Sequence, residues 1–478
     1  MVVQVAENEE SLPQLLGEFS PVDVWQRHLN TVFYGLHGDR VQEFYQTFAT
    51  ADYRLGYALA ADYVERALQR LRNRPGTMTD PLTIMEWGCG NGNLAACFLD
   101  HLQALDRDAV LYPRLQYVLL DASETVLDCA RDNADLARHR ERVQFVHAAV
   151  HDLQSYRDGS VDRIVCNELW SELPTKLLFR KAGDVMEEYI RPNLKETRLE
   201  DFPDWAGLIH LFEKADIAGL KRLPAFLEDL VWEREYRAVV AKDMPFRRLV
   251  MDFLKLFDEE VLVPVNTGAA TVLKEANRLM APDALGLSGF DAGTMDEAVL
   301  NDPDKPCYNV VGGQLSFMVN FALLEDVAKQ VGGRVRVEPQ KEFVGHNLGA
   351  NVMSFMDVLA SHPAVPRGGQ WEVDRLIVQT IEAVNAGGYA SPYERTIALP
   401  LAPETPDEPR RELERLLARQ PGHGIADTVA YVTEDEVLSV MDQLEALGYE
   451  RHGIRNALMA PPQSVDYFHF WMGPDDTR

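Results

Sequence analysis

Hydrophobic and polar positions follow a helical period in the first part of the chain. Between residues 18 and 74, apolar residues recur every three or four positions in "DRVQEFYQTFA" and "LGYALAADYVERALQRLRNR", a spacing that predicts helices. The stretch "RPGTMTDP" then breaks the pattern with proline and glycine. We therefore expect an N-terminal helical region over residues 1–80.

Residues 81–175 alternate between strand-like and helical runs. The apolar runs "LTIMEWG", "LQYVLLD", "VQFVHAAV" and "VDRIVCNEL" predict strands, and "NLAACFLDHLQAL" and "ASETVLDCARDNADLARHR" predict helices between the first three. Near-continuous apolar strands separated by helices are typical of a parallel sheet that is covered on both faces. The pattern predicts an α/β fold with a doubly wound, Rossmann-like sheet.

The pattern changes after the proline of "SELPTK". Residues 176–262 are rich in tryptophan, arginine and glutamate with a mostly helical period, which predicts an inserted helical subdomain that serves as a lid or substrate domain. Residues 263–365 return to sheet-like sequence and are expected to complete the core. Residues 366–478 form a predicted C-terminal extension, with a linker at 401–415, a helix capped by Thr433 and Glu436, and a strand-like "YFHFWMG" as a candidate for the last strand of the sheet.

Charge and cysteine content exclude several classes of function. The chain has 75 acidic and 47 basic residues and a net charge of −28, which repels phosphate backbones and anionic lipid head groups, so we expect neither nucleic acid nor membrane as a partner. Its five cysteines are scattered and form no CxxC pair, so we predict no metal site and no disulfide framework. The N-terminus lacks the pattern of a signal peptide, and we expect a cytoplasmic protein.

The stretch "IMEWGCGNGNL" carries the strongest signal for a ligand. Gly88, Gly90 and Gly92 follow an apolar strand and precede a helix, a context in which glycines let a ligand approach the backbone closely. Their spacing differs from that of the dinucleotide fingerprint and favours a nucleoside without a pyrophosphate. Glu86 precedes the loop, and Asp121 ends the next strand, where an acid can accept ribose hydroxyls. These features predict S-adenosylmethionine; a tight turn beside an exposed acid is the alternative.

A second polar group lies in "VDRIVCNELWSELPTKLL". Asn167 and Glu168 end an apolar strand at the carboxyl edge of the sheet, where ligands bind in open α/β folds. Glu172 follows four residues later, so one helical turn would place both carboxylates on one side. Such a pair could hold a guanidinium by bidentate hydrogen bonds and align its nitrogen with a methyl donor. The alternative for Glu172 is a helix-end acid that favours the helix dipole.

These motifs resemble those of a known family. "MEWGCGNGNL", "NELWSELPTKLLFRKAGDVMEEYI" and "GGQLSFMVNFALLEDVAKQVGGRVRVEPQKEFVGHNLG" are similar to the glycine loop, the Asn-Glu-x-x-x-x-Leu-Pro block and the late block of the MidA-type methyltransferases. That family includes the mitochondrial complex I assembly factor that methylates an arginine of a partner subunit. The resemblance spans residues 45 to 350, and it implies a class I methyltransferase fold with S-adenosylmethionine as cofactor.

The resemblance also implies roles for individual residues. Glu86 and the three glycines would form the cofactor loop, Asp121 would meet the ribose, and Asn167 with Glu168 would face the transferred methyl group. Relatives often have an aspartate before the "ALP" of the second block, whereas this chain has a serine and then Glu172, which shifts the acid by one position.

Two further residues complete the predicted cofactor site. Ala122 follows Asp121 in "DASE", which stands where relatives usually have serine and proline. Asp152 is a candidate for binding the adenine amine, and backbone groups near Ala149 are an equal alternative.

We therefore predict an S-adenosylmethionine-dependent methyltransferase that acts on a nitrogen, with an arginine of a partner protein as the first hypothesis. A basic or arginine-bearing partner suits a strongly acidic chain. The alternatives are methylation of a small molecule in a pocket capped by residues 176–262, and a non-catalytic assembly protein that keeps the fold and binds a partner. The sequence leaves the oligomeric state open, with a homodimer among the alternatives.

Overall fold

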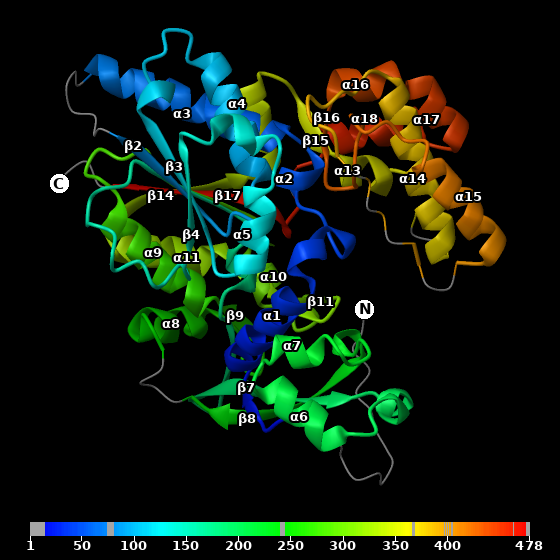
Figure 1. Cartoon of the computed structure of the whole chain (residues 1–478). Helices are drawn as coiled ribbons and strands as arrows, with labels where there is room; N and C mark the ends of the chain where they lie inside the picture. The colour runs from blue at the N-terminus through cyan, green and yellow to red at the C-terminus, as the bar shows by residue number, and fades with distance from the viewer. Residues whose placement is uncertain are drawn as a thin grey trace.

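The computed structural model describes residues 15–73, 81–239, 244–365, 369–395, 397, 399, 401–402, 405–461 and 463–474. Figure 1 shows a large α/β core, a smaller sheet below it and a helical unit beside it that is drawn in yellow and orange. The predicted break at "RPGTMTDP" lies almost wholly in residues 74–80, outside the described residues.

The core sheet has the strand order β14-β17-β10-β5-β2-β3-β4. Its strands are β2 (Leu82–Trp87), β3 (Leu115–Asp121), β4 (Val143–His147), β5 (Arg163–Asn167), β10 (Gly286–Thr294), β14 (Gly333–Pro339) and β17 (Asp466–Pro474), with the short β13 (Val319–Asn320) beside the end of β10. β2 lies between β3 and β5, and the chain order reverses there. A ligand site is expected at the carboxyl ends of these strands, because crevices open where the order of a doubly wound sheet reverses.

Helices cover both faces of the core sheet (Figure 1), which confirms the predicted doubly wound α/β fold. Ile84 of β2 packs against one group of helices and its neighbour Met85 against the other. Because both faces are buried, the strands read as continuous apolar runs. The first group is α3 (Arg54–Asn73), α4 (Asn93–Leu105), α5 (Glu124–Arg131) and α12 (Gln340–Leu348), and the second is α9 (Thr267–Leu279) and α11 (Phe321–Gln330).

β17 corrects the predicted boundary at residue 366. The strand lies between β10 and β14 and runs antiparallel to both, so the end of the chain is an interior part of the core sheet and not an extension of it. Phe470 and Met472 of β17 are fully buried in the apolar layer beneath α9 and α11.

The segment 176–262 is not mostly helical, as the sequence predicted, but forms an antiparallel sheet. β7 (Asp184–Leu194) pairs with β6 (Lys176–Lys181) and β8 (Leu230–Ala238) of the segment. Two strands outside the segment complete the sheet, since β1 (Ser20–Pro21) pairs with β7 and β9 (Val263–Val265) pairs with β6. Arg191 of β7 lies opposite Glu233 of β8 and forms an ion pair with it at 2.6 Å. Opposite charges can pair across neighbouring strands or between successive turns of a helix. The charge pattern of the sequence therefore did not distinguish a sheet from helices. The segment also contains the helices α6 (Trp205–Glu213), α7 (Ile217–Leu220) and α8 (Arg247–Phe253).

Helix α1 (Val22–His37) joins the smaller sheet to a β-hairpin. Its Leu29 and Phe33 are fully buried in a cluster that also holds Leu177 of β6 and Phe317 of the hairpin. The hairpin consists of β11 (Tyr308–Val311) and β12 (Gln314–Phe317). The remaining short elements of this part are α2 (Phe48–Ala51), α10 (Glu297–Leu300) and the 3₁₀ helices Gly38–Glu43, Tyr112–Arg114, Leu136–His139, Trp170–Glu172, Glu196–Asp201, Leu227–Asp229 and Leu254–Leu256.

The helical unit beside the core has its own apolar centre. The predicted cap is confirmed, because the Glu436 N–H donates to the Thr433 hydroxyl at 3.3 Å and the Thr433 N–H donates to the Glu436 carboxylate at 2.8 Å. Its elements are β15 (Val352–Ser354), α13 (Phe355–Ala360), α14 (Gln370–Ala386), α15 (Asp407–Leu417), β16 (Tyr431–Thr433), α16 (Glu434–Ser439), α17 (Met441–Leu447) and α18 (Arg451–Met459).

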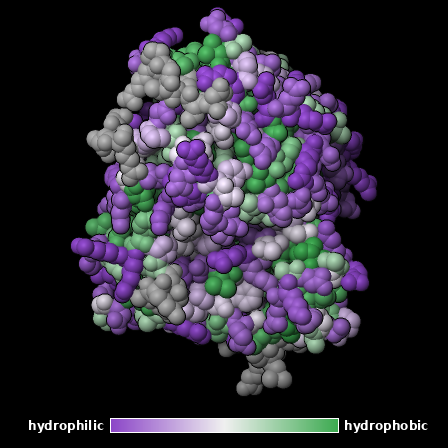
Figure 2. All heavy atoms as spheres, turned by 60° about the vertical axis from the view of Figure 1, so that its left-hand side comes forward, coloured by the Kyte–Doolittle hydropathy of each residue, from purple (hydrophilic) through white to green (hydrophobic). Residues whose placement is uncertain are grey.

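The outer surface agrees with the charged composition. The face shown in Figure 2 is mainly hydrophilic, and its apolar residues form small separate patches. Within the described ranges, every helix is too short or too polar to cross a lipid bilayer.

The position of β17 makes a testable prediction about stability. Phe470→Ala removes a fully buried ring from the core and should lower the free energy of unfolding by about 3–5 kcal/mol. Met459→Ala, at a residue that is 80% exposed, is the control and should change it by less than about 0.5 kcal/mol. Denaturant unfolding followed by circular dichroism measures both; equal values for the two variants would contradict an interior position of β17.

Candidate active site

The glycine loop connects β2 to α4 at the carboxyl edge of the sheet. The N–H groups of Gly88 and Cys89 both donate to the carbonyl of Leu120, at 2.8 and 3.1 Å, and so hold the loop against the end of β3. Gly88, Gly90 and Gly92 have φ values of 68°, 54° and 77°, in the left-handed region that residues with a Cβ rarely adopt.

Gly90 faces open space. A Cβ atom built on Gly90 would have no atom within 4 Å, whereas on Gly88 and Gly92 it would meet leucine side chains at 3.0 and 3.2 Å. The loop therefore has a bare backbone at its centre, next to the strand-end carboxylate of Asp121. One oxygen of Asp121 accepts a hydrogen bond from the Gly90 N–H at 3.4 Å and the other from the Ser123 N–H at 2.9 Å.

These residues fit the nucleoside part of S-adenosylmethionine. The open space at Gly90 gives room for a close approach to the backbone, and the Asp121 carboxylate at its edge is an acceptor for ribose hydroxyls. Burial raises the pKa of Asp121 to about 6, and its backbone N–H donors partly oppose this shift. The carboxylate is therefore mainly ionised at neutral pH and can accept both hydroxyls.

The other predicted cofactor residues lie around this space. Glu86 is buried beneath the loop, where it accepts a hydrogen bond from the Tyr117 hydroxyl at 2.7 Å and burial raises its pKa to about 8. Ala122 follows Asp121, and its carbonyl lies 3.1 Å from a ring nitrogen of His147. Asp152 is exposed in the turn after β4, at the same edge of the sheet as Asp121.

Glu168 directly follows β5 with a φ of 50°, an uncommon value for a non-glycine residue that often marks a functional site. Its N–H donates to the carbonyl of Phe290 on β10 at 2.7 Å. Its Oε1 atom and the Oδ1 atom of Asn167 are buried and have no hydrogen-bond partner within the described residues. Unpaired buried acceptors are costly, so these atoms are suited to receive donors from a ligand.

Glu172 ends the 3₁₀ helix Trp170–Glu172, and its carboxylate is held by two phenols. The Tyr34 hydroxyl lies 2.8 and 2.7 Å from its two oxygens, and the Tyr45 hydroxyl lies 3.3 Å from one of them. Burial raises the pKa of Glu172 to about 7. The carboxylate is therefore held inside the protein and is not displayed at an exposed helix end.

The structure brings Glu168 and Glu172 into one pocket and adds a third acid that the sequence analysis missed. The pocket has a volume of 300 Å³ and includes Asp291 of β10. The Asp291 carboxylate accepts hydrogen bonds from the N–H groups of Ser171, at 3.0 Å, and Ala292, at 2.9 Å. The available signal was a single acid within the otherwise uncharged strand "GLSGFDAGT".

Burial raises the pKa of all three acids, and the charge of Asp291 adds to the shifts of Glu168 and Glu172. Burial and then the charge of Asp291 raise the pKa of Glu168 to about 8, and burial raises the pKa of Asp291 to about 6. The charge of Asp121 contributes to the raised pKa of Glu172, which places the cofactor loop within electrostatic reach of the pocket. None of the described residues that line the pocket is basic. A bound cation would therefore relieve the repulsion and lower these pKa values.

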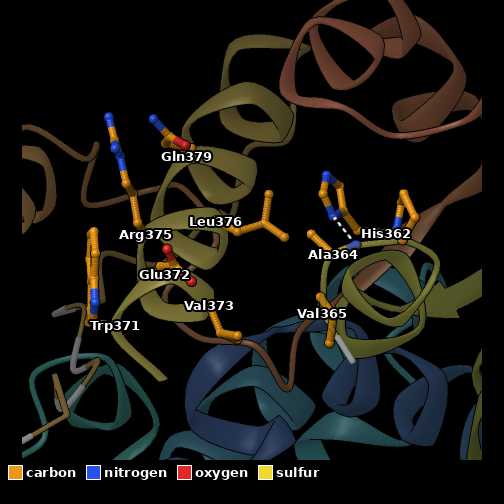
Figure 3. Close-up of a pocket in the computed structure, with 10 residues that line it drawn as sticks. His362, Ala364, Val365, Trp371, Glu372, Val373, Arg375, Leu376 and Gln379 are labelled. Atoms are coloured by element: carbon orange, nitrogen blue, oxygen red, sulfur yellow. Dashed lines mark hydrogen bonds between the residues drawn. The ribbon is translucent and has the colours of Figure 1, made fainter. Parts of the chain in front are cut away.

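A larger hollow of 690 Å³ lies elsewhere, between the end of α13 and the first half of α14 (Figure 3). Figure 3 shows Trp371 and Arg375 on α14 and His362 across the hollow, with the Ala364 N–H donating to the His362 ring at 3.1 Å. This hollow belongs to the helical unit, and neither the glycine loop nor the three acids line it.

Comparisons with known proteins agree with this chemistry. Residues 59–213 match the model of a family described as putative S-adenosyl-L-methionine-dependent methyltransferases. This segment contains the glycine loop, Asp121, Glu168 and Glu172. No curated protein matches the chain.

Several solved structures are similar to this chain. A likely methyltransferase from Burkholderia thailandensis bound to S-adenosyl-homocysteine is 14% identical, with a TM-score of 0.49 over 72% of this chain and 78% of that one. A native structure of an uncharacterised protein from the same organism is 17% identical, with a TM-score of 0.42 over 73% and 80%. A methyltransferase from Aquifex aeolicus is 11% identical, with a TM-score of 0.26 over 57% and 82%.

The chain is an S-adenosylmethionine-dependent methyltransferase with a class I, Rossmann-like core, and S-adenosylmethionine is its cofactor. The family match confirms these predictions and the resemblance to the MidA-type enzymes on which they partly depended.

The open space at Gly90 leads to a prediction about cofactor affinity. Gly90→Ala places a methyl group in the space that the cofactor requires and should weaken S-adenosylmethionine binding by at least about tenfold. Gly183→Ala is the matched control, because Gly183 also has a positive φ and open space within 4 Å of where its Cβ would lie, but belongs to the exposed turn between β6 and β7. Titration calorimetry on both folded variants decides the matter; equal affinities would remove Gly90 from the cofactor site.

Proposed function

We propose that the protein transfers the methyl group of S-adenosylmethionine to a nitrogen of an arginine side chain in a partner protein. The observation that supports this proposal is the pocket beside the cofactor loop, where Glu168, Glu172 and Asp291 meet without a basic lining residue among those described. An arginine guanidinium stays protonated under physiological conditions and offers five N–H donors in one plane. It therefore matches both the charge of the pocket and its unsatisfied acceptors.

The three acids of the pocket can both bind a guanidinium and orient it. Glu168 offers a buried oxygen that lacks a partner among the described residues, while the carboxylates of Glu172 and Asp291 are fixed by Tyr34 and Ser171. Donors and acceptors held in this way can orient a planar guanidinium before the reaction, which removes most of the entropic barrier. The tyrosine and backbone partners also leave little freedom for the acids to move apart.

Proton balance gives Glu168 a second task. The reaction breaks the bond between sulfur and the methyl carbon and forms a bond between nitrogen and that carbon, and the nitrogen then loses one proton. Burial and neighbouring charge raise the pKa of Glu168 to about 8, so its carboxylate is the strongest base among the three acids. Glu168 accepts this proton, and the methylated guanidinium leaves with its single positive charge.

The test of this function uses an extract of cells that lack the enzyme. The purified protein and S-adenosylmethionine labelled in the methyl group are added, and the label is followed into protein and into small molecules. We expect label in protein, recovered as methylarginine after hydrolysis. Label only in small molecules would establish the alternative acceptor class, and an absence of labelled protein would contradict the proposal.

Single substitutions should separate catalysis from cofactor binding. Glu168→Gln should lower the turnover number by about 100-fold or more, because it removes the base and a charged acceptor, while S-adenosylmethionine affinity stays within about twofold, as for a general base used only in the reaction. Glu172→Gln should lower turnover less, because Tyr34 continues to hold the side chain. The double variant should cost less than the sum of the two, because both act on one group.

Glu188→Gln is the control for these variants, since Glu188 is also buried and has a raised pKa but lies in β7, outside the pocket. Its turnover should remain that of the parent. Unchanged turnover in both Glu168→Gln and Glu172→Gln would overturn the proposed role of the pocket.

The raised pKa values predict the pH dependence. The acids bind a guanidinium only when ionised, so kcat/KM should rise with pH across the range of their pKa values, which are about 6, 7 and 8 for Asp291, Glu172 and Glu168. Asp291→Asn removes a charge that raises the pKa of Glu168, so the rising limb of its profile should move to lower pH. A limb that stays in place or moves to higher pH would show that Asp291 does not act on Glu168.

A further inference from the structure

One wall of the carboxylate pocket is the hairpin of β11 and β12. Tyr308, Asn309 and Val311 of β11 line the pocket together with Gln314 of β12. The two strands are joined by two glycines with φ values of 59° and 88°, the conformation of a tight two-residue hairpin turn.

The hairpin tip is held firmly. A Cβ on Gly312 would come within 2.4 Å of the Phe44 ring, and one on Gly313 within 2.3 Å of the Leu227 side chain. These close contacts leave no room for a side chain at the turn, and they fix the hairpin against the N-terminal region and the smaller sheet. The hairpin is therefore a wall of the pocket that is fixed by packing.

The outer edge of β12 is closed by a side chain. The Leu315 N–H donates to the Asn30 side-chain oxygen at 3.0 Å, and the Asn30 amide nitrogen donates to the Leu315 carbonyl at 3.0 Å. Asn30 thus makes the two hydrogen bonds that a neighbouring strand would make. Leu315 is opposite Val310 in the register of the hairpin.

This register gives the direction of the backbone groups of Val310. In an antiparallel pair, two opposite residues either both point their N–H and C=O groups toward each other or both point them away. Because those of Leu315 point to Asn30, those of Val310 point outward, along the other edge of the hairpin. Val310 is 41% exposed, and its N–H is held by the side chain of its neighbour Asn309 at 3.0 Å, a local bond that an added strand can replace.

We propose that the acceptor protein binds as an extended strand along the outer edge of β11, so that its arginine side chain enters the carboxylate pocket. Exposed strand edges are templates for pairing, and main-chain hydrogen bonds then give affinity while alternate side chains enter pockets. The occupant is a basic segment because Glu168, Glu172 and Asp291 lie in the pocket that β11 lines. This inference rests on the proposed function and adds to it the conformation in which the acceptor binds.

Val310→Pro tests the inference. Proline removes the outward N–H and obstructs a paired strand, but it is tolerated on an exposed edge because that N–H is not part of the hairpin. Val310→Thr is the matched control, since it keeps a β-branched side chain and the N–H. The acceptor is the protein fraction of the extract described above, with S-adenosylmethionine affinity and melting temperature measured for both variants.

We expect protein labelling by Val310→Pro to fall at least about tenfold below that by Val310→Thr, the change that loss of one or two peptide hydrogen bonds produces. The pH profile of the residual labelling should remain that of the parent, because the three acids are untouched. Equal labelling by the two variants overturns strand addition and leaves the proposed function standing. An altered pH profile or cofactor affinity in Val310→Pro also overturns it, because the loss then comes from a damaged pocket. A parent enzyme that labels no protein overturns the proposed function, and this inference with it.

Discussion

The contact of the Trp170 indole with the bare backbone of Gly289 fixes the spacing of the acids in the pocket. A Cβ on Gly289 would lie 2.4 Å from the indole ring, so only glycine lets Trp170 pack this closely against β10. Trp170 is fully buried, and the ring of Phe470 from β17 packs edge-on against it at 5.1 Å. Glu168 and Glu172 stand on either side of Trp170 in the chain. The packing of the Trp170 side chain therefore determines the positions of the Glu168 and Glu172 carboxylates.

Holding three acids together has an electrostatic cost that the fold offsets with donors from distant segments. Tyr34 comes from the N-terminal helix, and the N–H groups of Phe48 and Ser171 come from two further elements. Each donor stabilises the ionised form, while burial and repulsion favour the neutral form. The resulting pKa values between about 6 and 8 leave the pocket poised to ionise when a cation enters. Such shifts are common where a fold prepares groups for binding and proton transfer.

The methyltransferase core supplies only part of this pocket. Asp291 lies in β10 and Glu168 directly follows the neighbouring strand β5, but Tyr34, which holds Glu172, belongs to α1, and one wall of the pocket is the β11–β12 hairpin. The hairpin is in turn fixed by Asn30 of α1. The cofactor half of the site is therefore built from adjacent chain segments. The acceptor half instead combines α1, the hairpin and β17 of the core sheet, which are far apart in the sequence.

Features that depend on neighbouring residues could be predicted before the structure was known. The glycine loop, the strand-end acids Asp121 and Glu168 and the cap of α16 were all predicted, because a short segment contains both the turn and the groups that it positions. The candidate strand "YFHFWMG" is indeed part of the sheet, but the structure was needed to place it between β10 and β14. The structure was also needed to show that segment 176–262 forms a sheet, that Asp291 lines the pocket and that Tyr34 holds Glu172. Tyr34 and Glu172 are 138 positions apart, and Gly289 pairs with Phe470 across an even longer distance in the sequence. Contacts between residues so far apart depend on the packing and hydrogen bonds of the whole fold, so local sequence patterns do not predict them.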